Sequence, residues 1–205
     1  MAYSDFSATD LIRNFNLKFE AIELFANTPE IAPSPWLTEA LRRGREQGFA
    51  SEKSRSERLV TPILMELSDR NHHDFSIYSG MNLDIDEAAG LRGECDFVFS
   101  LSRVQDFVSA PVVCITEAKK QDLEQGTVPC TAQLLGARKL NELEGTSPSV
   151  LYGCSTTGIE WRFLKLVGQT VTLDEDRYLI TDLGKLLGVL QQILDESRKD
   201  AAVVR

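Results

Sequence analysis

The sequence predicts an α/β protein in which helices pack on both faces of a mixed β-sheet. Two observations predict this class. Residues 51–70 carry apolar side chains at helical spacing, and residues 74–120 contain three short segments rich in β-branched and aromatic residues. A helix over 127–145 and a strand over 149–156 then complete the order helix, strand, strand, strand, helix, strand.

The first fifty residues are expected to form a helical extension packed on this core, with residues 51–205 as the main domain of a single globular unit. Residues 28–48 predict a Pro-rich loop followed by a helix, with Ser34 as its N-cap and Pro35 at its first position. Residues 11–25 fit a helix or a strand, because their apolar side chains satisfy both periods.

The helix over 51–70 contains its own signals. Pro62 predicts a kink or a restart, with Thr61 as a cap, and Ser54 and Glu57 have the spacing of a capping box. The strand within residues 111–120 carries an apolar run over 112–115 that is typical of burial on both faces, so we expect it to be central in the sheet. The strand over 149–156 is expected to turn at Thr157 and Gly158 into another strand, and residues 182–200 to form a C-terminal helix.

Composition and charge limit the classes of function. No apolar run approaches the roughly 20 residues that a membrane-spanning helix requires. The N-terminus lacks the basic and apolar regions of a secretory signal, so we expect a cytoplasmic protein. A net charge of −9 argues against a general nucleic-acid coat, but it permits a local basic site, and Lys and Arg gather within residues 42–58 and 119–139. A homo-oligomer is one alternative that the sequence leaves open.

Four cysteines occur at wide spacing and form no C-x-x-C pair: Cys95, Cys114, Cys130 and Cys154. Their surroundings are apolar or strand-like. This pattern predicts reduced, buried thiols in preference to zinc ligands or disulfides.

Charged and polar residues fall at the ends of the predicted strands. Asp96 is near the start of one strand, Glu117 and Lys119 end the next, and Gln133 lies in the helix that follows. Side chains two residues apart on a strand share a face, so Glu117 and Lys119 are expected to point together, with Ala118 between them. A salt bridge at the mouth of the strand is the alternative interpretation of this pair.

This arrangement resembles the PD-(D/E)XK nuclease superfamily, in particular the N-terminal nuclease domain of type I restriction motor subunits and stand-alone proteins with the same core. The resemblance covers roughly residues 51–170 and implies a restriction-endonuclease-like α-β-β-β-α-β core. Asp96 matches the lone acid, Glu117 and Lys119 the Glu-x-Lys, and Gln133 the glutamine on the following helix. Cys95 stands where the family name has proline.

The resemblance implies a metal-dependent phosphodiesterase that acts on nucleic acid, DNA in preference to RNA. Mg²⁺ or Mn²⁺ would be held by Asp96, Glu117 and the backbone carbonyl of Ala118, because hard cations choose oxygen ligands. Lys119 would hold the attacking water and stabilise the charge on the phosphate, and Gln133 would orient the water or a ligand. Convergence of these groups at the end of the sheet is therefore expected.

A further glutamate on the first helix often joins such sites, and Glu52 and Glu57 compete for this role. They are about 140° apart on an α-helix, so only one is expected to face the site. Glu52 is favoured, because residues 51–55 resemble the Glu-x-x-Arg of the restriction domains, whereas Glu57 has a structural role in the predicted capping box. Glu94 is a weaker candidate ligand, and His72 and His73 are interpreted as polar loop residues.

Two other functions fit the same sequence. The first is a catalytically silent nuclease-like fold that serves as a binding or assembly module, which the acidic composition favours. The second is a nuclease-like fold that acts on a small nucleotide or on RNA. Binding of a divalent cation between Asp96 and Glu117 separates the enzyme from the module.

Overall fold

The computed structural model describes residues 1–118 and 123–203. These residues form an eight-stranded mixed sheet in the order β1, β7, β6, β5, β4, β3, β2, with β8 paired to β6. The strands are β1 (Lys18–Ile22), β2 (Ser76–Asn82), β3 (Glu94–Ser100), β4 (Val112–Ala118), β5 (Val150–Thr156), β6 (Glu160–Val167), β7 (Thr170–Asp174) and β8 (Tyr178–Leu179). The β4–β5 and β1–β7 pairs are parallel and the other pairs are antiparallel, so the predicted mixed α/β architecture is confirmed.

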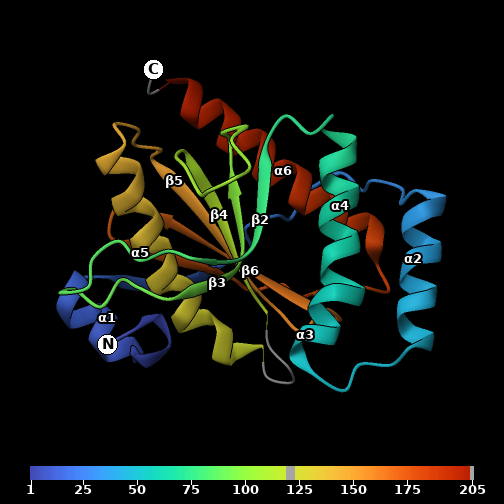
Figure 1. Ribbon diagram of the computed structural model, residues 1–205, viewed down its shortest axis with the longest axis horizontal. Helices are drawn as coiled ribbons and strands as arrows, with labels where there is room; N and C mark the ends of the chain where they lie inside the picture. The colour runs from blue at the N-terminus through green and yellow to red at the C-terminus, as the bar shows by residue number, and fades with distance from the viewer. Residues whose placement is uncertain (119–122, 204–205) are drawn as a thin grey trace.

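Helices cover both faces of the sheet, with α5 on one side of the strands and α4 on the other (Figure 1). The helices are α1 (Ala8–Phe15), α2 (Pro35–Glu46), α3 (Glu52–Arg55), the π-helical η2 (Ser56–Val60), α4 (Thr61–Arg70), α5 (Thr127–Leu143), α6 (Leu183–Val203), and the short 3₁₀ turns η1 (Tyr3–Asp5) and η3 (Glu124–Gly126). Within the described residues, no helix combines the length and the apolar character needed to span a membrane.

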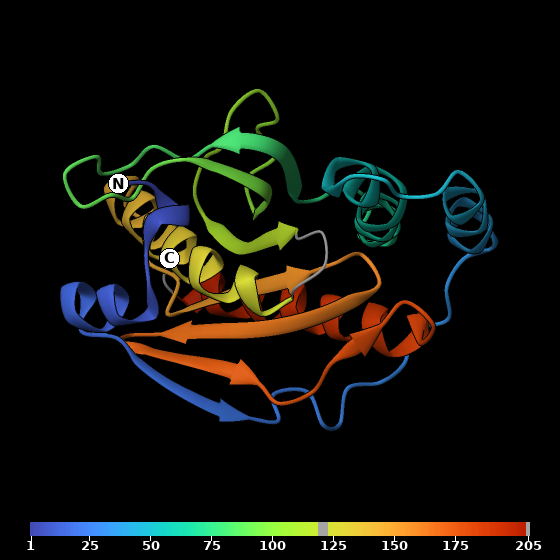
Figure 2. The same ribbon diagram turned by 90° about the horizontal axis from the view of Figure 1, so that it is seen from below.

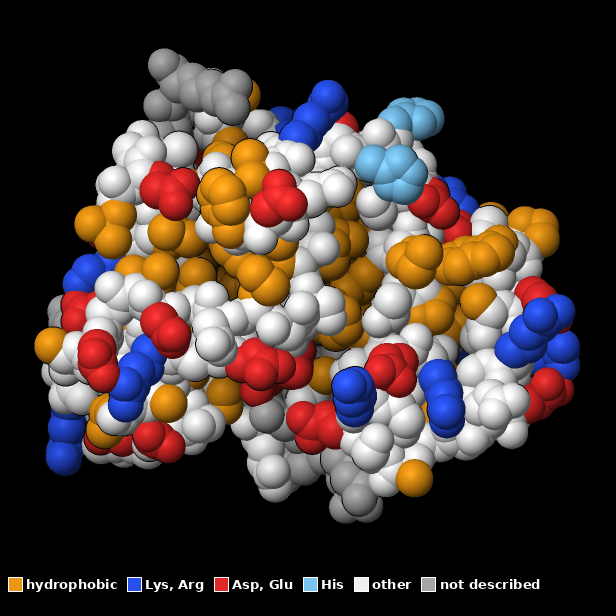
Figure 3. All heavy atoms as spheres, viewed as in Figure 1, with side chains coloured by type: hydrophobic (Ala, Val, Ile, Leu, Met, Phe, Trp, Pro, Cys, Tyr) orange, Lys and Arg blue, Asp and Glu red, His pale blue; other side chains and the backbone are white. Residues whose placement is uncertain are grey.

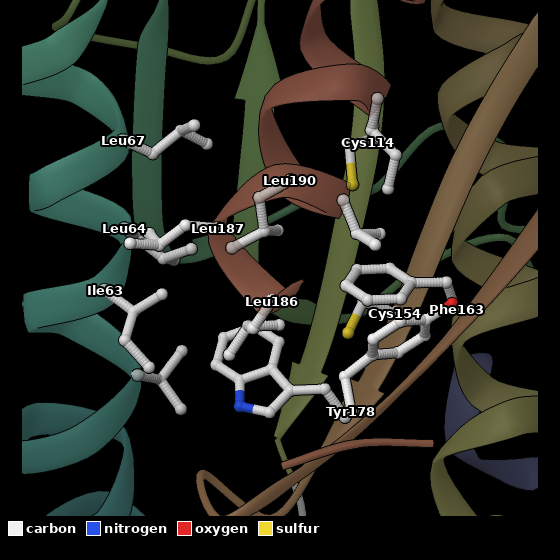
Figure 4. Packing of buried hydrophobic residues seen from close by; sticks show 14 of the residues in the cluster. Ile63, Leu64, Leu67, Cys114, Cys154, Phe163, Tyr178, Leu186, Leu187 and Leu190 are labelled. Carbon is white, nitrogen blue, oxygen red and sulfur yellow. The ribbon is translucent and has the colours of Figure 1, made fainter. Parts of the chain in front are cut away.

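Two apolar clusters hold these layers together. One joins α2, α4 and α6 to the sheet, and Figure 4 shows Leu64 of α4 beside Leu187 of α6, with Phe163 further along the same cluster next to Cys154. The other joins η1, α1 and α5 to the opposite face. Strand β4 lies between β3 and β5 and every one of its residues is buried, as the sequence predicts for a central strand.

The N-terminal region is only partly the helical extension that we expected. The ambiguous segment contains both elements: α1 ends at Asn16, which has a left-handed φ of 55°, and β1 follows. Strand β1 pairs with β7 and forms one edge of the sheet, where Figure 2 shows the blue strand beside an orange one. Ser34 caps α2, with Pro35 in its first turn, as predicted.

The helical segment before β2 differs from the prediction in its caps. Ser51, not Ser54, is the N-cap of α3, and its side chain accepts from the backbone N–H of Ser54. Thr61 does not cap a restarted helix. The chain stays helical through the π turn η2, in which the N–H of Thr61 donates to the carbonyl of Ser56. This π turn ends two residues before Pro62, whose missing N–H disturbs α-helical hydrogen bonding.

The remaining local predictions agree with the structure. Helix α5 ends at Leu143 and is followed by Gly145 with a positive φ of 76°. Strands β5 and β6 are joined by a turn at Gly158, and the C-terminal helix is α6. All four cysteines are buried and free, as expected for structural thiols.

Candidate functional site

The candidate site lies where β3 and β4 approach the end of their pairing. Phe97 of β3 pairs with Thr116 of β4, so Asp96 and Glu117 occupy the next positions on the two strands. Asp96 Oδ2 accepts a hydrogen bond of 2.7 Å from the backbone N–H of Ala118. The Asp96 carboxylate is therefore fixed against the backbone of the residue that follows Glu117.

Helix α5 supplies the partner of Glu117. The Nε2 of Gln133 donates to Glu117 Oε2 at 2.7 Å and to the carbonyl oxygen of Glu94 at 3.3 Å. Glu117 is 7% exposed and Gln133 is 2% exposed. Because Nε2 faces two acceptors, this orientation of the amide is the one that satisfies them.

The amide oxygen of Gln133 lacks a hydrogen-bond partner among the described residues. This atom, Oε1, is buried. A buried acceptor without a partner is costly and is usually satisfied by water, a donor or a cation. The orphaned oxygen beside the Glu117 carboxylate is a feature that a water molecule or a metal ion would complete.

A second polar contact sets the position of α5 against β4. The side chain of Asn141, 1% exposed, accepts from the N–H of Val112 and donates to its carbonyl oxygen, both at 2.7 Å. These two bonds attach the later turns of α5 to the start of β4. They help to place Gln133, two turns earlier on the helix, over Glu117.

A pocket of about 520 Å³ opens beside Asp96. Four carboxylate residues line it, two from the helical segment and two from β3: Glu52, Glu57, Glu94 and Asp96. Lys53 is the one basic residue among the described lining residues. The two carboxylates predicted to bind a metal therefore have different neighbours. Glu117 accepts a hydrogen bond from α5, whereas Asp96 lines a pocket beside α3 and η2.

Both candidate glutamates of the first helix reach this pocket, although α-helical spacing predicted only one. The physical reason is the change from α to π geometry between α3 and η2, which widens the helix and alters the angle between side chains five residues apart. The predicted capping role of Glu57 is also wrong, since the cap is formed by Ser51 and Ser54.

Gly80 shapes the opposite wall of the pocket. It has a φ of +63°, in the left-handed region that favours glycine. A Cβ at this position would lie 3.4 Å from Glu94 Oε1. Ser79 pairs with Phe97 and Met81 with Cys95 in one register, which places Gly80 opposite Asp96. A glycine here leaves space next to the carboxylates because it has no side chain.

The pKa of the buried Cys95 thiol is affected by the negative charges around it. Burial raises the pKa of Cys95 well above its usual range, and the nearby charges of Glu117, Asp96 and Glu94 raise it further. Three carboxylates therefore lie close enough to act on one buried sulfur atom. Such a group of like charges is stabilised when a cation binds.

Not every predicted site residue can be placed. Lys119 lies outside the described residues, so its expected position beside Glu117 is still a prediction. Among the described residues, no group of three or more His, Cys, Asp or Glu side chains is arranged to hold a metal. His73 bonds to Ser68, Nδ1 to Oγ at 3.0 Å, in the loop that the sequence predicted for the two histidines.

The basic residues of the predicted segments mostly have local partners. Arg42 and Arg43 form ion pairs with Glu39 on α2, and Lys139 pairs with Asp86. Lys53, by contrast, lines the acidic pocket.

Sequence reasoning missed Gly80 and Asn141. A glycine inside a strand and an asparagine inside an apolar helix were the available signals. Comparison of the chain with protein-family models, curated proteins and solved structures finds no match.

Proposed function

We propose that this protein is a metal-dependent, endonuclease-like phosphodiesterase of the PD-(D/E)XK type. The observation that carries the proposal is the contact of Asp96 with the backbone of Ala118, directly after Glu117, at the end of the buried central strand. The element order α4, β2, β3, β4, α5, β5 supports it, because it is the order expected of a restriction-endonuclease-like core. The bond from Gln133 to Glu117 supports it further.

The donor set fits a hard divalent cation. Asp96 and Glu117 offer carboxylate oxygens, the backbone carbonyl of Ala118 is nearby, and Gln133 Oε1 is a buried acceptor without a partner in the described chain. Mg²⁺ or Mn²⁺ held by Asp96 and Glu117 would activate a water molecule and neutralise charge on a phosphate. Four carboxylates line the pocket, so without a bound cation the pocket would repel a phosphate. A bound cation would reduce this repulsion.

The protein's own residues have separate roles in this proposal. Gln133 holds the Glu117 carboxylate in one orientation and presents its free oxygen beside it. Glu52, Glu57 and Glu94 add negative potential that attracts cations into the pocket. Lys119 is proposed to stabilise charge on the phosphate, as in the family that the sequence resembles.

A catalytically silent binding or assembly module is the second candidate. Two observations favour it. Among the described residues, no cluster of three or more potential metal-binding side chains is present. The neutralisation of Arg42, Arg43 and Lys139 by acidic neighbours also reduces the positive charge available to nucleic acid.

Cleavage assays separate the two candidates. The purified protein with Mg²⁺ or Mn²⁺ is tested at low salt on single-stranded, double-stranded and branched DNA and on RNA, since an acidic protein binds phosphates weakly at high salt. Under the enzymatic proposal, Lys119→Ala and Asp96→Asn abolish cleavage. The exposed positions Lys18 and Asp106 provide matched controls, Lys18→Ala and Asp106→Asn, which retain it.

Calorimetry completes the test without depending on activity. We expect the wild-type protein to bind Mn²⁺ and Asp96→Asn to lose this binding while keeping its fold, because an asparagine can still accept the bond from Ala118. No cleavage of any substrate, together with no metal uptake at millimolar concentration, would favour the module.

A further inference from the structure

A second pocket, of about 410 Å³, lies between α4 and the edge strand β2. Its walls include Leu64 and Met65 of α4 and the aromatic residues Phe75, Tyr78 and Phe97. Figure 3 shows a recess with an apolar floor at this place and acidic side chains below it. The volume falls within the range of roughly 300–1,000 Å³ typical of small-molecule sites.

This α4–β2 pocket is continuous with the acidic pocket of the candidate site. Thr61, Ser79 and Phe97 line both of them. The two halves of the resulting groove differ in charge. Glu52, Glu57, Glu94, Asp96 and Lys53 line one half, whereas none of the described residues that line the other is Asp, Glu, Lys or Arg.

Polar groups surround the uncharged half. Ser68 and His73 stand at its edge and bond to one another, and the exposed Gln105 offers an amide that both donates and accepts. Met65 is 49% exposed at the mouth. An apolar floor with hydrogen-bonding groups at the rim suits a flat, neutral ring whose edge carries donors and acceptors.

We infer that the α4–β2 pocket binds an unpaired nucleobase of a nucleic-acid strand whose neighbouring phosphate lies at the acidic end of the groove. A nucleic-acid strand places neutral aromatic bases next to anionic phosphates. The uncharged half of the groove would take the base, and the acidic half, with its bound cation, would take the neighbouring phosphate. The inference rests on the proposed function, because the metal-binding end defines where the phosphate lies.

The substrate class follows from the shape of the pocket. A base can enter a pocket behind the edge strand only when it is neither paired nor stacked, and extracting one from a duplex costs several hydrogen bonds and stacking contacts. The preferred substrate is therefore a single strand or an unpaired segment. Phe75, Tyr78 and Phe97 are 3–5% exposed and form an apolar floor that contacts a base without reading its edge, so little sequence preference is expected.

The test measures binding to a short single-stranded DNA that carries one 2-aminopurine, a base whose fluorescence changes on stacking. The same strand annealed to its complement is the comparison, and both are titrated at low salt with EDTA and again with Ca²⁺. Ser79→Phe fills the shared wall from an exposed position on an edge strand. Ala21→Phe, exposed on the opposite edge strand β1, is the matched control.

We expect the wild-type protein to bind the single strand more tightly than the duplex and to change its 2-aminopurine fluorescence. Ser79→Phe should weaken binding of the single strand about tenfold and suppress the fluorescence change, while Ala21→Phe leaves both unchanged. Met65→Ala, which removes an exposed side chain at the mouth, should weaken binding in the same direction. It tests the pocket independently if Ser79→Phe fails to fold.

The outcomes distinguish this inference from the proposed function. If the protein cleaves nucleic acid but folded Ser79→Phe and Met65→Ala bind single strands as the wild type does, the base pocket is wrong and the enzyme stands. If single strands bind through the pocket but no cleavage or metal uptake occurs, the pocket stands and the enzyme is wrong. Equal binding of duplex and single strand also overturns the pocket.

Discussion

The amide of Gln133 on α5 and the carboxylate of Glu117 on β4 share a buried hydrogen bond of 2.7 Å. This bond links the helix to the central strand at the point where the proposed cation would bind. The amide oxygen of Gln133, Oε1, has no hydrogen-bond partner within the described chain. The Gln133 side chain is thus expected to contribute both to the free energy of unfolding and to the affinity for a metal ion.

Replacing Gln133 tests this link. Gln133→Met keeps the length of the side chain but removes a donor from the buried Glu117 carboxylate and the Glu94 carbonyl. We expect the free energy of unfolding to fall by about 1–3 kcal/mol in urea denaturation and Mn²⁺ affinity to fall as well. Gln169→Met, at an exposed turn, is the control, and an equal loss in both variants would contradict the assigned role.

Asn141 offers a test of how α5 is positioned. Asn141→Leu removes the two bonds to the N–H and carbonyl of Val112 at a site that is 1% exposed. We expect a loss of at least about 2 kcal/mol in the free energy of unfolding, because two buried backbone groups lose a partner. The next residue on the helix is exposed and provides the control Glu142→Leu. If the two variants had the same melting temperature, Asn141 would not position α5 in this way.

The sequence predicted most of the core because periodicity reports which face of an element is buried. Strand β4 and helix α5 carry clear patterns, and both were predicted near their actual ends. Strand β1 was ambiguous because the apolar side chains of residues 11–25 satisfy both the helical and the strand period, and four of the five residues of this edge strand are exposed, so burial does not select one period. Its partner β7 comes from the other end of the chain, and no local signal predicts that pairing.

The residues that the sequence singled out are partly brought together by the fold, while their proposed chemistry stays a prediction. Asp96 and Glu117 stand out because charged groups near the ends of buried strands are unusual, and Gln133 because it is an amide in the helix that follows. The approach of both Glu52 and Glu57 to one pocket depends on the π turn before Pro62, which α-helical geometry does not anticipate. The orphaned oxygen of Gln133 depends on tertiary packing alone.

The two glutamates are now expected to act together. Glu52→Gln and Glu57→Gln should each lower Mn²⁺ affinity in calorimetry by removing negative charge from the pocket, and neither should cost a helix cap. The cap belongs to Ser51, so Ser51→Ala should lower the free energy of unfolding by about 1 kcal/mol without a change in metal affinity. If Glu57→Gln lowered the free energy of unfolding more than Ser51→Ala does, Glu57 would be a helix-capping residue after all.

Acid should weaken the attachment of α2 to α4 through Glu66. This carboxylate is 3% exposed and accepts bonds from the backbone and hydroxyl of Ser34, at 3.0 and 2.5 Å, and from Arg70 at 2.8 Å. Burial alone would raise the pKa of Glu66, but the hydrogen bonds from Ser34 and Arg70 outweigh it and lower the pKa. The folded state therefore favours the ionised carboxylate more than the unfolded state does.

The sign of the pH effect follows from this lowered pKa. The contribution of Glu66 is fully present above the unfolded pKa near 4.5 and is lost as the pH falls through the lower folded value. We expect Glu66→Gln to cost about 1–3 kcal/mol at pH 7 in urea denaturation, and its difference from the wild type to shrink steadily below about pH 4.5. The exposed control Glu142→Gln should show no such convergence. A difference for Glu66→Gln that stayed constant from pH 7 to pH 3 would mean that the Ser34 and Arg70 bonds do not depend on the charge of this side chain.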